Sequence, residues 1–159
     1  MASSSCPNLG RQMAMRDHIL RSLLILLGAA AVLIGSSIFF LGAQITAATT
    51  ERLTDFALGL PFEGGETFSP TTDSELRFYA PFWVAYGAAL IWTSARLDDH
   101  RRWIVPLAGL FLAGGVGRAL AWLAGGPPRL PFIILLGLEL TVPVLIVALA
   151  WKPGGKPPA

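Results

Sequence analysis

The stretch LLILLGAAAVLIGSSIFFL, residues 23–41, indicates the fold class because it carries no charged side chain. The charge-free run continues to Thr50. A helix needs about 20 consecutive apolar residues to cross a hydrocarbon core that is about 30 Å thick. The apolar run also exceeds the roughly 7–15 residues of a signal-peptide core, so we interpret it as an uncleaved membrane span.

Three further apolar blocks follow along the chain. Residues 78–95 carry no charge, residues 103–124 are interrupted only by Arg118, and residues 131–151 are interrupted only by Glu139. The composition agrees, since 53% of the residues are hydrophobic and 14% are charged, whereas soluble domains average about 25% charged residues. The sequence therefore predicts an all-α integral membrane protein, a four-helix transmembrane bundle. The expected spans cover residues 20–47, 74–95, 103–124 and 131–151.

The positions of arginine and lysine predict the orientation, because cytoplasmic loops carry an excess of both residues. Eight of them lie before the first span, between the second and third spans, or after the fourth: Arg11, Arg16, Arg21, Arg96, Arg101, Arg102, Lys152 and Lys156. We therefore expect both termini on the cytoplasmic side of a bacterial inner membrane. The net charge of +2 follows from this topology, so we expect no nucleic-acid partner.

The domain organisation is expected to be simple. Residues 17–151 form one membrane domain between a flexible N-terminal segment, residues 1–16, and a polar tail, residues 152–159. Small residues recur on the first span at Gly28, Ala31, Gly35 and Gly42, and small residues let a second helix approach closely.

The first external loop contains a short amphipathic segment. Leu53, Phe56, Ala57 and Leu60 recur at helical spacing, and most polar side chains of the segment lie opposite them. This helix either lies flat on the membrane face as a lid or continues the first span past the headgroups. After it, residues 72–75 (TDSE) fit a capping box that opens the second span.

The chain contains few cysteine and histidine residues, which limits the metal and haem sites that it can form. One cysteine permits no internal disulfide and no thiolate cluster. The two histidines, His18 and His100, fall outside the spans, so a haem held between two histidines in the membrane is excluded. We expect no metal and no cofactor.

Arg118 and Glu139 are the two ionisable residues deep inside spans, and such residues are functional candidates. At 1.5 Å per residue, Arg118 lies about 9 Å and Glu139 about 12 Å below the outer boundary. Because these depths agree, we predict that the two side chains pair in the outer half of the membrane. Gly114, Gly115 and Gly117 leave room beside Arg118 for a backbone or a ligand.

Other polar residues are expected near this pair. Glu75, Tyr79 and Trp83 share one face of the second span, together with Tyr86. Arg77 lies on another face, where it reaches the interface or turns toward another span. The predicted ligand-binding residues, which include one from the outer end of the first span, are Arg118, Glu139, Tyr79, Glu75, Arg77, Trp83 and Gln44.

Each of these assignments has a purely structural alternative. Arg118 and Glu139 can be an ion pair that only fixes helix register, and Glu75 can be a capping residue. The aromatic side chains of the second span can be packing and interfacial anchors.

Three groups of residues carry a resemblance to a known family: Ser74–Tyr79 with Trp83, Gly114–Arg118, and Leu138–Leu140. In this order they resemble a bacterial family of small four-span membrane proteins that is catalogued as a domain of unknown function. The resemblance covers about residues 23–151. It implies that Glu75, Arg77, Tyr79, Arg118 and Glu139 belong to a site that the family shares, and it implies no activity.

Three classes of function are compatible with these features. The first is a binding protein that holds a lipid, a quinone or another amphiphile in an outer-leaflet polar pocket, because arginine clamps carboxylate and phosphate groups. The second is an accessory subunit of a homo-oligomer or larger membrane complex. The third is a membrane enzyme that uses Glu139 as acid or base on a lipophilic substrate, with Tyr79 and Arg118 assisting. We favour binding over catalysis.

Overall fold

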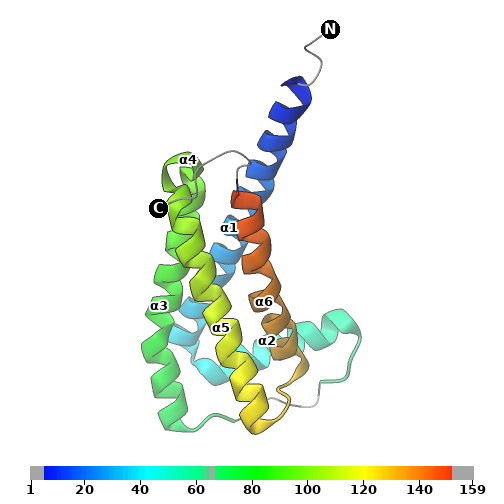
Figure 1. Ribbon diagram of the computed structural model, residues 1–159. Coiled ribbons are helices and arrows are strands. Elements are labelled where there is room, and N and C mark those ends of the chain that lie inside the picture. Colours follow the sequence, from blue (N-terminus) through cyan, green and yellow to red (C-terminus); the bar gives the residue numbers. More distant parts are fainter. Residues whose placement is uncertain (1–5, 63, 65–66, 152–159) are drawn as a thin grey trace.

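The computed structural model describes residues 6–62, 64 and 67–151 of the chain, and every regular element in this described part is helical. This result confirms the all-α prediction. The elements are α1 (Cys6–Leu41), α2 (Ala43–Leu58), α3 (Pro70–Ala95), α4 (Leu97–His100), η1 (Arg101–Trp103), α5 (Ile104–Gly125) and α6 (Leu130–Ala150). The four long helices run side by side with alternating direction (Figure 1). The predicted polar tail, residues 152–159, lies outside the described residues.

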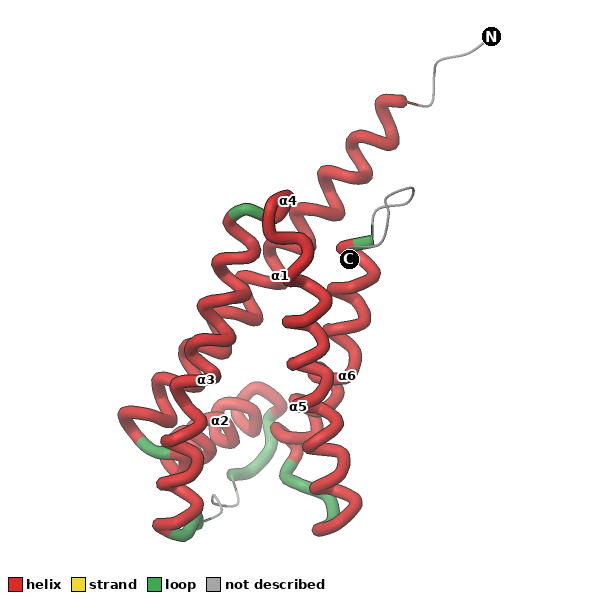
Figure 2. Tube along the Cα trace, turned by 60° about the vertical axis from the view of Figure 1, so that its left-hand side comes forward, coloured by secondary structure: helices red, strands yellow, loops and turns green. Residues whose placement is uncertain are grey.

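The bundle has two different ends (Figures 1 and 2). We call the end with the beginning of α1, the short helix α4 and the end of α6 the inner end. We call the other end, which holds α2 and the two loops before α3 and α6, the outer end. Helix α1 packs along α3, and α5 packs along α6.

Three helical segments are long and apolar enough to cross a membrane: Arg11–Leu41, Leu97–Gly125 and Leu130–Ala150. They indicate a membrane protein. Helix α3 has 26 residues, which is also sufficient length. It is less apolar because Tyr79, Trp83 and Tyr86 carry polar groups in the middle of the helix.

The α1–α3 interface is built on glycines. A Cβ atom at Gly28 would lie 2.7 Å from the carbonyl oxygen of Gly87, and one at Gly87 would lie 2.5 Å from that of Gly28. One at Gly35 would lie 2.9 Å from the carbonyl oxygen of Ala80. Only glycine permits backbones to approach this closely. The predicted small-residue face of the first span is therefore confirmed, and the helix that approaches it is α3.

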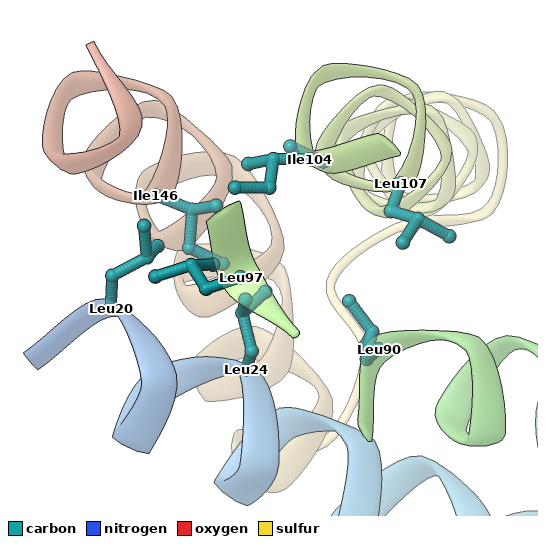
Figure 3. Close-up of a cluster of buried hydrophobic side chains, with 8 residues drawn as sticks. Leu20, Leu24, Leu90, Leu97, Ile104, Leu107 and Ile146 are labelled. Carbon is teal, nitrogen blue, oxygen red and sulfur yellow. The ribbon is translucent and has the colours of Figure 1, made fainter. Parts of the chain in front are cut away.

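The hydrophobic core lies near the inner end, where side chains from five helices meet (Figure 3). Its members are buried and come from α1 (Leu20, Leu24), α3 (Leu90), α4 (Leu97), α5 (Ile104, Leu107, Ala108) and α6 (Ile146). Arg101 closes this end, because its Nη2 atom lies 2.6 Å from Asp17 and its Nη1 atom donates to the carbonyl of Ala150 at 3.0 Å.

A sharp corner separates α1 from α2. Gly42 has φ 94° and ψ 160°, which is a conformation that residues with a Cβ rarely adopt. The first helix therefore ends at Leu41, and the expectation that the amphipathic segment continues the first span is wrong. Helix α2 is a separate helix that crosses the outer end of the bundle (Figures 1 and 2).

Helix α2 turns its polar face toward the bundle. Glu51 and Asp55 are buried, with 2% and 9% of their surface exposed. Leu53 and Phe56 on the opposite face are 64% and 87% exposed. This orientation is the reverse of that in a water-soluble protein, and it is suited to a helix whose outer face meets lipid.

Two local predictions concern the beginnings of helices. The described part of the segment 1–16, from Cys6 onward, forms the first turns of α1, and the flexibility of this segment stays a prediction. Residues 11–16 (RQMAMR) are strong helix formers, which explains this continuation. The capping box at residues 72–75 is wrong, because α3 begins three residues earlier. Ser69 is the N-cap, its hydroxyl accepts the N–H of Thr72 at 3.1 Å, and Pro70 follows at the first helical position.

Candidate functional site

Arg118 of α5 and Glu139 of α6 form the predicted ion pair. The Nε atom of Arg118 lies 2.7 Å from Oε2 and 2.9 Å from Oε1 of Glu139. The Glu139 side chain is 3% exposed, whereas that of Arg118 is 33% exposed. The carboxylate is therefore enclosed by protein, and the guanidinium reaches from the pair toward the surface of the bundle.

Gly115 explains why these two helices come close enough for the pair. A Cβ atom at this position would lie 2.9 Å from Cβ of Glu139 and 3.2 Å from its carbonyl carbon. Its neighbours Gly114 and Gly117 differ, because a Cβ atom at either would meet nothing within 4 Å. One glycine of this group thus serves helix packing, and the other two leave open space.

A groove with a volume of about 590 Å³ lies beside the pair, between α3 and α5. Five of its ten lining residues are aromatic or phenolic, and most of its surface is apolar. Among the described residues that line it, Glu139 is the one with a formal charge. The lining comprises Tyr79, Phe82, Trp83, Tyr86, Ala89, Leu107, Leu110, Phe111, Gly114 and Glu139.

The groove is bordered by hydrogen-bond donors that the described residues leave unused. Arg118 is not itself a lining residue, but it contacts Glu139, which is. Its Nη1 and Nη2 atoms make no hydrogen bond to a described residue, and its Cζ atom lies 5.9 Å from the ring centroid of Phe132. The indole N–H of Trp83 and the hydroxyl of Tyr79 likewise have no partner within the described part of the chain. The hydroxyl of Tyr86 is different, because it donates to the carbonyl of Leu107 at 3.0 Å. The site therefore favours a ligand that supplies acceptor atoms.

Arg77 belongs to a different cluster at the corner between α1 and α2. Its Nε atom lies 2.7 Å from Asp73, and its Nη1 atom donates to the carbonyl of Phe39 at 2.8 Å. Asp73 in turn accepts the N–H of Ala43 at 2.8 Å. The hydrogen bonds from Arg77 and then from Ala43 lower the pKa of the Asp73 carboxyl below its ordinary value. Arg77 therefore turns toward another helix, as one of the two alternatives predicted, and it holds the end of α1.

Two other predicted ligand residues lie away from the groove. Gln44 is exposed on the first turn of α2, and Glu75 is exposed on the second turn of α3. Neither lines the groove. The structure therefore brings together four of the seven predicted residues at the pair and its groove: Arg118, Glu139, Tyr79 and Trp83.

The sequence did not point to a second ion pair at the outer end. Glu51 of α2, which is 2% exposed, lies 3.5 Å from Nε of Arg129, in the connection before α6. This contact anchors α2 beneath α6. A signal was present in the sequence, because Glu51 and Asp55 are four residues apart and thus share one helix face.

Comparison with protein-family models identifies the family of this chain. Residues 19–150 match the family model described as Domain of unknown function (DUF4345). No curated protein matches the chain, and no solved structure matches it. The matched region begins beside the inner core and includes the corner, the ion pair and the entire lining of the groove.

Proposed function

The chain belongs to the DUF4345 family, a domain of unknown function, and from its geometry we propose that it binds a lipid, a quinone or another amphiphile. The binding site is the groove between α3 and α5, with the polar head of the ligand at Arg118. The observation that carries the proposal is an apolar groove of about 590 Å³ whose lining includes the buried carboxylate of the ion pair, Glu139. Ligand pockets commonly combine about 300–1,000 Å³ of mostly apolar space with a few polar groups.

The proposal includes four membrane crossings, with α3 as the fourth. The beginning of α1 and the end of α6 lie at the same end of the bundle (Figure 1), where Arg101 joins Asp17 to Ala150. Three crossings, by α1, α5 and α6 alone, would place the beginning of α1 and the end of α6 on opposite sides of the membrane. A fourth crossing by α3 places them on the same side. The basic residues of the inner end support a cytoplasmic location for both termini, in a bacterial inner membrane.

Cysteine labelling tests this topology. In a Cys6→Ser background, Asp99→Cys marks the connection between α3 and α5, and Thr67→Cys marks the loop before α3. With a membrane-impermeant maleimide on intact cells, we expect Thr67→Cys to be labelled and Asp99→Cys to be protected until the membrane is permeabilised. Labelling of Asp99→Cys in intact cells would show that α3 does not cross.

The packing of the small residues on the first span favours ligand binding over the accessory-subunit alternative. The glycine face of the first span is covered by α3 within the same chain. It is therefore not free to receive a partner helix. The groove beside α5, in contrast, is open along a face where a Cβ atom at Gly114 would meet nothing within 4 Å.

Filling the groove tests the binding proposal. Gly114→Leu places a side chain in the groove, whereas Gly117→Leu on the same helix makes the same chemical change outside its lining. We expect native mass spectrometry in mild detergent to detect a bound amphiphile on the original chain and on Gly117→Leu. The Gly114→Leu variant should lose it. An equal ligand content in both variants would place the amphiphile elsewhere.

A further inference from the structure

We infer that the occupant of the groove is an uncharged, planar amphiphile that carries carbonyl acceptors, of the quinone type, and not an anionic lipid. This inference rests on the proposed function, because it names the ligand class of the same site. Three independent features lead to it: the charge of the ion pair, the balance of donors and acceptors, and the shape of the lining.

The first feature is charge. Arg118 and Glu139 together are neutral, and both oxygens of Glu139 contact Nε of Arg118 within 2.9 Å. A phosphate or carboxylate head would add a negative charge beside a carboxylate that is 3% exposed. In a medium of low dielectric constant, such an uncompensated charge is costly. A neutral head avoids this cost.

The second feature is the hydrogen-bonding character of the site. At the groove and the adjacent ion pair, the groups without a hydrogen bond to a described residue can all donate: the indole N–H of Trp83 and the hydroxyl of Tyr79 in the lining, and the Nη atoms of Arg118 beside Glu139. The carboxylate of Glu139, an acceptor, is already engaged. A ligand that brings carbonyl or ether oxygens satisfies these donors without requiring a new acceptor from the protein.

The third feature is shape. The aromatic rings of the lining offer flat faces, and those of Tyr86 and Phe111 are nearly parallel, with an interplanar angle of 18° and centroids 6.4 Å apart. Tyr86 is held in place by its hydrogen bond to Leu107. Flat apolar walls favour a planar ring over a bulky tetrahedral head, and Leu107 and Leu110 extend the apolar surface for a tail.

The ligand preference of the original chain tests this inference directly. The protein is placed in nanodiscs of phosphatidylcholine, and quenching of tryptophan fluorescence is titrated with decylubiquinone and, in competition, with decyl phosphate. Both probes carry the same alkyl chain. We expect decylubiquinone to bind at least about tenfold more tightly, which corresponds to about 1.4 kcal/mol. Equal or tighter binding of decyl phosphate would overturn the inference.

A charge variant provides a second test. Glu139→Gln leaves the arginine without its counter-ion, so decyl phosphate should gain at least about tenfold in affinity relative to decylubiquinone. The double variant Arg118→Gln, Glu139→Gln restores neutrality and should lose this gain. An unchanged preference in Glu139→Gln would show that the charge of the pair does not select the ligand.

Different results would contradict the binding of an amphiphile in the groove and the preference for a quinone-type ligand. If decyl phosphate binds more tightly and Gly114→Leu blocks it, the groove is a ligand site and only the ligand class is wrong. If neither probe binds and no amphiphile is retained by the original chain, the proposed function itself is wrong.

Discussion

The inner and outer ends of the bundle solve the same packing problem differently. At the inner end, large aliphatic side chains such as Leu24, Leu90 and Ile146 come from different helices and fill one shared core. Toward the outer end, the helices pack mainly as two pairs, α1 with α3 and α5 with α6. The groove lies between α3 and α5 and begins at the core, because Leu107 belongs to both. The aliphatic core therefore holds the two helix pairs together at one end of the groove.

The two pairs also use glycine for different purposes. Gly28 and Gly87 bring α1 and α3 together over an uncharged interface. Gly115 brings α5 to α6 at the residue that carries the buried carboxylate. Close backbone approach therefore serves packing alone in the first pair, and it serves both packing and a polar site in the second.

The largest effect is expected for Leu24→Ala at the inner end. Leu24 is fully buried, and removal of such a side chain leaves a cavity whose cost is about 2–5 kcal/mol. Leu33→Ala is the matched control on the same helix, since Leu33 is 70% exposed, and it should change stability by less than about 0.5 kcal/mol. The free energy of unfolding is measured by titration with sodium dodecyl sulfate in mixed micelles. Equal losses would contradict the assignment of the core to the inner end.

A smaller effect is expected for Gly115→Ala in the outer half. The new Cβ atom would lie 2.9 Å from Cβ of Glu139, so α5 and α6 must separate, at a cost of about 1–3 kcal/mol. Gly117→Ala makes the same change where nothing lies within 4 Å, and it should not lower stability. The same micelle titration measures both variants. If Gly115→Ala is as stable as Gly117→Ala, the helices are less tightly packed at this point than the distances indicate.

Several features of the fold and site were predictable because they depend on local sequence or on simple geometry. The apolar runs predicted the three segments that are long and apolar enough to cross, and the small residues of the first span predicted a close helix. The pairing of Arg118 with Glu139 followed from depth alone, since consecutive antiparallel helices place equal depths side by side.

Other features of the fold could not be predicted from local sequence or from simple geometry. The start of α3 was misplaced because Thr72 and Ser69 are both acceptable caps, although Pro70 favours the second. In the sequence, Gly42 looks like the other small residues of the first span, and the corner follows only from its backbone conformation. Phe111 and Leu110 look like ordinary lipid-facing residues in the sequence, and only the separation of α3 from α5 makes them the wall of a groove.

The sequence by itself determined that this chain is helical, that it belongs in a membrane, and that one arginine and one glutamate meet within it. These properties follow from hydrophobicity and helix geometry, which act over about one turn or one span. The tertiary structure decided that α2 faces inward with Glu51, that Arg77 holds a corner, and that the ion pair borders a groove. Those outcomes depend on contacts between residues far apart in the chain, whose combined packing no single span specifies.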